Sequence, residues 1–358
     1  MFFKKKNAVA VSGLKEEIKK TKYDIHGALH VNNKGKLVDH DGNVVTLRGL
    51  SSHSLSWYPQ YINRDFFEFM KDEWKIDIVR LAMYTEEEDG YCVGDEANKE
   101  KLLEVIDRGV KYATEVGLYV IIDWHILLDY NPWMFKDEAV KFWEIVAEKY
   151  KSYGNIFYEI CNEPNMDCDW RDVKSYAEHP EHLKDMLTKK TCEWSDIKSF
   201  AEEIIPVIRK HDPYAVILVG TPVWSQRVDQ AAADPITIDK NLMYVLHFYA
   251  NTHKDELRAR LQKAAEEGLP LFVTEFGTCS ADGAGKHNPD EAKKWLDLLD
   301  KYEISYILWS ISNRDETCAT FKPTCEKTGK DFTDEDMREP ALWFVNELKK
   351  GRGKNDKS

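Results

Sequence analysis

The stretch NIFYEICN, residues 155–162, is continued by Glu163, Pro164 and Asn165, so an apolar run ends in an amide and a carboxylate. The β-branched and aromatic residues favour a buried strand, and proline ends it. A carboxylate beside a buried strand is costly unless it has a partner or a function. The alternative is an Asx-type turn with Glu163 solvated. The ends of the other strands distinguish these two interpretations.

Seven further apolar runs resemble this one, and amphipathic segments separate them. Strands that are apolar on both faces are typical of a parallel sheet covered by helices. Eight such units in 358 residues favour a (β/α)8 TIM barrel, in the α/β class, over an open doubly wound sheet. The other predicted strands are 46–51, 76–83, 118–125, 215–221, 242–249, 270–277 and 304–310, and the clearest helices are 98–116, 138–150, 196–210, 254–267 and 290–302.

The segments outside the repeating units predict the rest of the organisation. The turn signals NNKG and HDGN within residues 23–47 predict a hairpin that caps the bottom of the barrel. We expect one barrel domain at 23–349, an N-terminal tail at 1–22 and a disordered, polar tail at 350–358. Residues 165–194 form a long polar insertion after the fourth strand.

Composition limits the function classes. The chain has 50 basic and 63 acidic residues, a net charge of −13, which argues against nucleic acid and anionic membranes as partners. No apolar run is long enough to span a membrane, and the start, MFFKKKNAVAVSGL, contains no clear signal peptide. The 11 Trp and 17 Tyr residues suit the binding of sugars as well as core packing.

The seven cysteines show no metal-binding spacing. Cys161 lies in an apolar strand and is expected to be a reduced core residue. Cys168 with Cys192, and Cys318 with Cys325, could each form a disulfide, and neither pairing is favoured.

Polar and aromatic residues collect where the predicted strands end. Active sites of barrel enzymes lie at the C-terminal ends of the strands. Each residue alone could be structural, for example a satisfied buried histidine, but packing does not explain the joint pattern. The residues are His53 and Trp57, Arg80 and Tyr84, Asp123 to His125, Asn162 and Glu163, His247 and Tyr249, Glu275, and Trp309.

Two of these residues, Glu163 and Glu275, are carboxylates on different strands. No nucleophile elbow, P-loop or dinucleotide-binding motif accompanies them. Paired carboxylates with aromatic neighbours are typical of glycoside hydrolysis, in which one is the acid/base and the other the nucleophile. Arg80, His247 and Tyr249 could keep Glu275 charged, which makes Glu163 the acid/base. We expect no metal and no organic cofactor; the DWH segment at 123–125 is the one candidate for a metal-dependent alternative.

The sequence resembles glycoside hydrolase family 5, of the endo-β-1,4-glucanase (cellulase) type, from about Tyr23 to Glu347. The segments YEICNEPN, NLMYVLHFYA and PLFVTEFGT, in this order, carry the resemblance. It implies that Glu163 is the acid/base and Glu275 the nucleophile. It also implies supporting roles for Arg80, His125, Asn162, His247 and Tyr249, and substrate contacts for His53, Trp57, Tyr84, Trp224, Trp309, Arg314 and Glu316.

The resemblance implies a secreted enzyme that cleaves internal β-1,4 bonds of glucans with retention, and we expect it to be a monomer. The 165–194 insertion is longer than the family pattern and is expected over the leaving-group side of the cleft. A β-mannanase, xylanase or lichenase of the same family would carry the same two glutamates. A non-catalytic sugar-binding barrel would keep the tryptophans and lose one glutamate.

Overall fold

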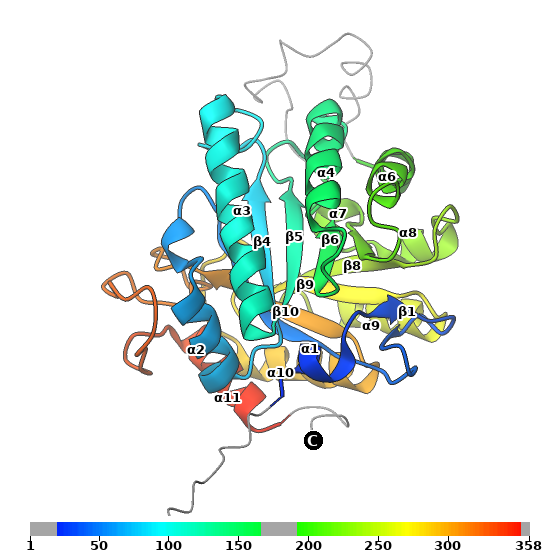
Figure 1. Cartoon of the computed structure of the whole chain (residues 1–358). Coiled ribbons are helices and arrows are strands. Elements are labelled where there is room, and N and C mark those ends of the chain that lie inside the picture. The colour runs from blue at the N-terminus through cyan, green and yellow to red at the C-terminus, as the bar shows by residue number, and fades with distance from the viewer. Residues whose placement is uncertain (1–19, 166–191, 352–358) are drawn as a thin grey trace, which may run out of the picture.

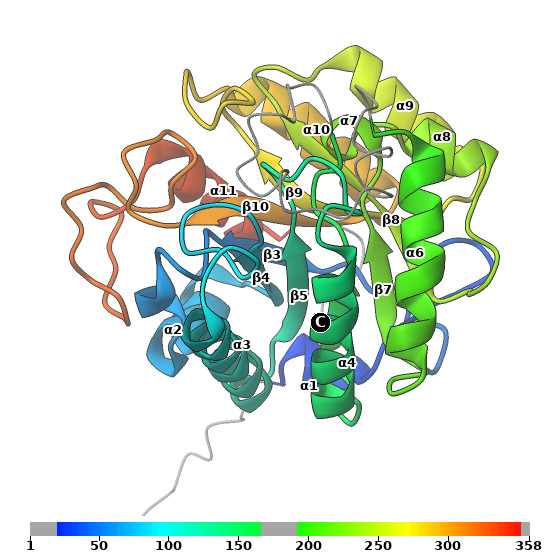
Figure 2. The same ribbon diagram turned by 90° about the horizontal axis from the view of Figure 1, so that it is seen from above.

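A closed barrel of parallel strands forms the centre of the molecule. The computed structural model describes residues 20–165 and 192–351, and within them eight strands close in the order β10-β3-β4-β5-β6-β7-β8-β9. Helices surround these strands in both views (Figures 1 and 2). The strands are β3 (Arg48–Ser52), β4 (Ile78–Tyr84), β5 (Tyr119–His125), β6 (Ile156–Glu159), β7 (Val216–Val219), β8 (Leu242–Tyr249), β9 (Leu271–Gly277) and β10 (Ser305–Ile311).

The helices pack their apolar faces against the outside of the barrel. Helix α3 begins after Asp95, whose side chain accepts a hydrogen bond from the Asn98 amide, and it ends at Gly117 in the left-handed conformation. The longer helices are α2 (Arg64–Trp74), α3 (Glu96–Val116), α4 (Lys136–Tyr150), α6 (Trp194–Arg209), α9 (Asp255–Glu266), α10 (Pro289–Lys301) and α11 (Glu339–Lys349). The short ones are α1 (Lys22–His26), η1 (Pro59–Tyr61), α7 (Pro222–Ser225) and α8 (Val228–Ala233).

The predicted TIM barrel is confirmed, and the five named helices begin and end within two residues of their predicted limits. The fourth and fifth strands are shorter than predicted. β6 covers only Ile156–Glu159 of the predicted 155–162, and its regular pairing with β5 ends where Glu159 lies opposite Asp123. Helices α2 and α11 were not among the named predictions.

The N-terminal hairpin is also confirmed. Strands β1 (His30–Val31) and β2 (Leu37–Val38) pair antiparallel, and Leu29 and Leu37 join the core inside the barrel. In Figure 1 this segment lies at the lower end, from which β4 and β5 start. The hairpin therefore caps the bottom and leaves the C-terminal ends of the strands for a site.

Several predictions concern residues outside the described ranges. These are most of the two tails, the insertion from 166 to 191, and Cys168 with its pairing to Cys192. Cys161 is a buried free thiol as predicted, and Cys318 and Cys325 are free thiols rather than a disulfide. Among the described helices, none has the length and apolar character needed to cross a membrane.

Candidate active site

A cavity of about 680 Å³ opens at the C-terminal ends of the strands. The structure brings nearly all the predicted site residues together there. Arg80 and Asn162 do not line the cavity and are buried beneath it. The lining includes His53, Trp57, Tyr84, His125, Glu163, Trp224, His247, Tyr249, Glu275, Trp309, Arg314 and Glu316.

Glu275 lies near the end of β9 and receives two directed hydrogen bonds. The Tyr249 hydroxyl donates to Oε1 at 2.8 Å, and Arg80 Nη1 donates to Oε2 at 3.2 Å. The tyrosine ring fits because residue 277 is glycine: a β-carbon there would lie 2.2 Å from Tyr249 Cδ1. Burial, followed by the charge of Glu163, raises the pKa of Glu275 to about 7, and His247, the charge of Arg80 and the Tyr249 hydrogen bond oppose that rise.

Arg80 is fully buried on β4 and contacts three carboxylates. Its guanidinium lies 2.9 Å from Asp123, 2.8 Å from Glu159 and 3.2 Å from Glu275. Nη2 also donates to Asn162 Oδ1 at 2.6 Å. A buried arginine surrounded by acceptors stays charged and holds them in fixed positions.

Sequence reasoning assigned no role to Glu159. It is the last residue of β6 and is completely buried. Both of its oxygens bond Arg80, and Thr274 Oγ1 donates to its Oε1 at 2.7 Å. The available signal was a charged residue inside the apolar run FYEIC, which has no place in a buried strand unless it is paired.

Glu163 lies on the turn that follows β6, and close backbone packing positions this turn. A β-carbon at Gly220 would lie 2.0 Å from the Cys161 carbonyl oxygen, so glycine is needed where β7 ends. The Ser225 hydroxyl donates to the Asn162 carbonyl at 2.6 Å. These contacts direct Glu163 toward the cavity.

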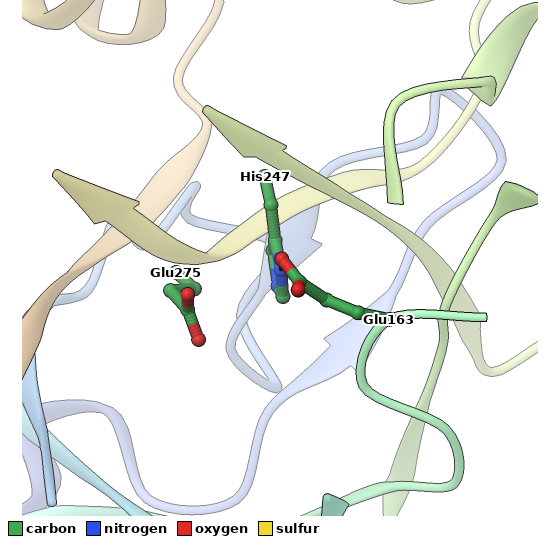
Figure 3. Close-up of side chains that lie close together, drawn as sticks. All are labelled: Glu163, His247 and Glu275. Carbon is green, nitrogen blue, oxygen red and sulfur yellow. Dashed lines mark hydrogen bonds and ion pairs between the residues drawn. The ribbon is translucent and has the colours of Figure 1, made fainter. Parts of the chain in front are cut away.

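Glu163 and His247 form a close pair. The Glu163 carboxyl oxygen Oε1 lies 2.9 Å from His247 Nδ1, and Figure 3 shows the carboxyl group beside the imidazole ring, with Glu275 nearby on the neighbouring strand. Burial raises the pKa of Glu163 to about 8, with Arg80 opposing and Glu159 adding to the rise. Burial lowers the pKa of His247 to about 4. At neutral pH these directions favour a protonated Glu163 and a neutral His247.

A stack of nearly parallel rings forms one wall. Tyr84 and His125 stack at 4.3 Å between ring centroids and 3° between planes, and Trp309 continues the stack at 5.3 Å from His125. His125 Nδ1 lies 2.6 Å from Asp123 Oδ2, which orients the ring. Trp57 Nε1 donates to the Glu88 carbonyl at 2.8 Å and fixes a second flat surface. Flat aromatic faces of this kind suit the apolar faces of sugar rings.

Polar residues from the loop after β10 lie beside Trp57 in the cavity wall. Arg314 Nε lies 3.3 Å from Glu316 Oε2, and the Arg314 guanidinium lies 5.7 Å from the Trp57 ring centroid. Glu316 Oε1 lies 3.6 Å from His53 Nε2. These contacts place Arg314, Glu316 and His53 around the Trp57 surface. That these residues contact substrate stays a prediction.

Other residues in the cavity wall were not predicted. Glu87 is buried, its Oε1 accepts the Leu128 amide at 3.0 Å, and burial raises its pKa to about 7. It lies in the acidic run 86–88, which reads as solvated and so gives no signal. The remaining unpredicted lining residues are Leu127, Leu128, Val223, Gln226, His253, Ala281, Asp282, Gly283 and Cys318.

Glu163, His247 and Glu275 also offer ligand atoms within 4.8 Å of one another, a spacing that a metal ion could use. Two contacts oppose a cation there. Arg80 already places a positive charge on Glu275, and both ring nitrogens of His247 have hydrogen-bond partners, Glu163 and Thr274. We therefore do not assign these residues as metal ligands.

A barrel with two carboxylates facing each other across an aromatic-lined cavity has the features of a glycoside hydrolase site. The family model described as Cellulase (glycosyl hydrolase family 5) matches residues 38–315. The chain belongs to this family, which confirms the resemblance read from the sequence.

Individual relatives of known sequence or structure support this family assignment. Endoglucanase A of Butyrivibrio fibrisolvens is 42% identical over 87% of this chain and 66% of that protein, and an endoglucanase of Clostridium saccharobutylicum is 39% identical over 87% and 63%. The chain thus spans just under two thirds of these relatives. The solved catalytic domain of a Thermobifida fusca endoglucanase, 33% identical, has a TM-score of 0.80 and covers 92% of this chain and 100% of that domain.

Proposed function

We propose that this chain is a retaining endo-β-1,4-glucanase that hydrolyses internal bonds of cellulose and related β-glucans. The main observation behind the proposal is the relation between the two carboxyl groups. An oxygen of Glu163 and an oxygen of Glu275 lie within 4.8 Å of each other. Retaining enzymes place these groups about 5–5.5 Å apart for direct attack, whereas inverting enzymes leave room for a water molecule.

The surroundings of the two carboxyl groups support different roles. Arg80 and Tyr249 donate hydrogen bonds to Glu275, and both bonds favour its charged form. Within residues 20–165 and 192–351, Glu163 has no such bond from a lysine or arginine, and it lies beside a neutral histidine. As the pair titrates, Glu275 therefore ionises first, and Glu163 keeps its proton.

In the first proposed step, an oxygen of Glu275 attacks the anomeric carbon while the glycosidic C–O bond breaks. The departing oxygen takes the proton of Glu163, and a glycosyl ester of Glu275 forms. In the second step, Glu163 removes a proton from water and the water oxygen attacks the same carbon. The ester bond breaks, and Glu275 leaves as a carboxylate.

The aromatic and polar wall supports a glucan substrate. Trp309 would lie under the sugar being cleaved, with His53, Trp57, Tyr84, Arg314 and Glu316 on the glycone side. Trp224, which also lines the cavity, would contact the leaving group. His125 and Asn162 would support the reacting sugar. We further propose that the enzyme acts outside the cell, as a monomer, on polysaccharide rather than nucleic acid.

The test is a reducing-end assay on carboxymethylcellulose, barley β-glucan, mannan and xylan with three proteins. The unsubstituted enzyme should prefer the β-glucans, and Glu275→Gln should lose several orders of magnitude on every substrate. Glu104→Gln, an exposed glutamate of α3, is the matched control and should keep full activity. A preference for mannan or xylan would transfer the proposal to that polysaccharide. Near-normal activity of folded Glu275→Gln would remove the nucleophile assignment.

A further inference from the structure

A line of hydrogen bonds connects the buried Arg80–Glu159 pair to Glu163. Thr274 Oγ1 donates to Glu159 Oε1 at 2.7 Å, and the same oxygen lies 2.8 Å from His247 Nε2. His247 Nδ1 in turn lies 2.9 Å from Glu163 Oε1. Thr274 is fully buried inside β9 and does not line the cavity, so it has no contact with substrate in this arrangement.

The protons in this line can be placed one after another, starting at Glu159. Arg80 Nε donates to Glu159 Oε2 at 2.8 Å and Nη2 donates to Oε1 at 3.1 Å, a bidentate pair that keeps Glu159 ionised. An ionised carboxylate only accepts hydrogen bonds. The single hydroxyl proton of Thr274 therefore points to Glu159.

The Thr274 oxygen is then left with lone pairs for its other contact, so His247 Nε2 must carry a proton and donate it. The charged or titratable groups around this ring are Arg80, His125, Glu159, Glu163 and Glu275. Burial dominates over these charges and lowers the pKa of His247 to about 4, so the ring is neutral above that pH. A neutral imidazole with its proton on Nε2 has a bare lone pair on Nδ1.

That lone pair faces Glu163 Oε1, and the contact is a hydrogen bond only if Glu163 supplies the proton. We propose that Thr274 and Glu159 are positioning residues: they fix the tautomer of His247 and thereby hold Glu163 protonated, ready for the first step. This inference rests on the proposed function for the acid role of Glu163. In the second step the proton that Glu163 takes from water restores the same arrangement.

Thr274→Val tests the proposal because it removes the hydroxyl while keeping the side-chain shape. His247 can then move its proton to Nδ1 and donate to an ionised Glu163. We expect the alkaline limb of the pH profile of kcat/KM to move down by about one unit. At pH 9, above both limbs, kcat/KM on cellotetraose should fall about tenfold, because a limb that is one unit lower leaves about a tenth as much protonated acid. On dinitrophenyl cellobioside, which needs no proton, the loss should stay below about threefold.

Two further variants separate this effect from a structural one. Thr274→Ser should restore the alkaline limb, because its hydroxyl can make the same two bonds. Thr278→Val, the matched control, removes a buried hydroxyl that binds His287 and should leave the limb unmoved. An unmoved limb in folded Thr274→Val, with equal losses on both substrates, would overturn the proposal.

Nitrogen-15 NMR of histidine-labelled, unsubstituted enzyme tests the tautomer without any variant. At pH 6 we expect His247 to carry its proton on Nε2, and a proton on Nδ1 would overturn the proposal even if Thr274→Val does not fold. This measurement is independent of catalysis. An active Glu275→Gln enzyme with the expected tautomer would mean that the proposed function fails while the proton placement stands.

Discussion

Arg80 and Glu275 are joined on the floor of the cavity, where Nη1 lies 3.2 Å from Oε2, although the two residues come from strands β4 and β9 on different parts of the barrel. The same guanidinium bonds Glu159 through its other edge. One buried cation therefore fixes the proposed nucleophile and the first member of the line that leads to the proposed acid.

Arg80→Lys should separate charge from geometry. A lysine keeps the positive charge but cannot bond Glu159 and Glu275 in two directions at once. We expect kcat to fall about a hundredfold or more on both cellotetraose and dinitrophenyl cellobioside, since a misplaced nucleophile slows attack whatever the leaving group. Steady-state kinetics on both substrates measures this. Loss on cellotetraose alone would show that Arg80 acts mainly through Glu163.

Arg80→Ala should be much more harmful to the fold than Arg80→Lys. It leaves Asp123, Glu159 and Glu275 buried without their cation. Removing one partner of a buried ion pair typically costs about 3–5 kcal/mol of unfolding free energy. Thermal unfolding of the two variants should therefore differ by several degrees, and similar melting temperatures would contradict the assigned network.

Glu163→Ala should affect substrates according to their leaving groups. Cleavage of natural glucans needs the proton, so its rate should fall to near background. Dinitrophenyl cellobioside should show a fast burst of dinitrophenol followed by slow hydrolysis of the glycosyl ester. Azide should restore turnover and give a β-glycosyl azide, because it attacks the glycosyl ester without needing a base. Equal losses on all leaving groups without azide rescue would exclude Glu163 as the acid/base.

The sequence predicted the barrel and placed Glu163 and Glu275 at its C-terminal end for one physical reason. The strands are mostly apolar, so a carboxylate near or just after a strand end, such as Glu275 or Glu163, stands out against its neighbours. The predicted limits of the named helices lie close to the observed ones because two signals coincide. The amphipathic period of each segment agrees with residues that begin and end helices, such as Asp95 and Gly117 around α3.

Residues that act from inside the strands gave weaker signals. Thr274 is β-branched and reads as an ordinary strand residue, so its hydrogen bonds to Glu159 and His247 could not be predicted. A strand buried on both faces has no alternation that shows which side chains point into the barrel. Glu87 lies in an acidic run, and only the structure shows that it is buried and accepts a hydrogen bond from the Leu128 amide.

Glu87→Gln should make the unfolding free energy of the protein depend less on pH. The folded pKa of Glu87, about 7, is above the usual value of 4.5, so its favourable contribution is complete below about pH 4.5 and is lost as the pH rises to 7. The variant lacks this loss and also relieves the repulsion of Asp129. We expect its unfolding free energy to exceed that of the unsubstituted enzyme by roughly 2 kcal/mol at pH 7.5 and by little at pH 4.5.

The matched control for this prediction is Glu88→Gln, which changes an exposed neighbour on the same loop. This substitution should leave the unfolding free energy unchanged at both pH values. Denaturant unfolding at both pH values measures the difference. An equal stability change at pH 4.5 and 7.5 in Glu87→Gln would mean that the buried carboxyl does not titrate as its surroundings indicate.

The central claim is that Glu163 and Glu275 act by double displacement, with their oxygens close enough for direct attack. Proton NMR of the first products from barley β-glucan tests it most directly, because each displacement inverts the anomeric carbon and two restore it. The account predicts that the β-anomer appears first and that the α-anomer grows in only by mutarotation. First appearance of the α-anomer would contradict it.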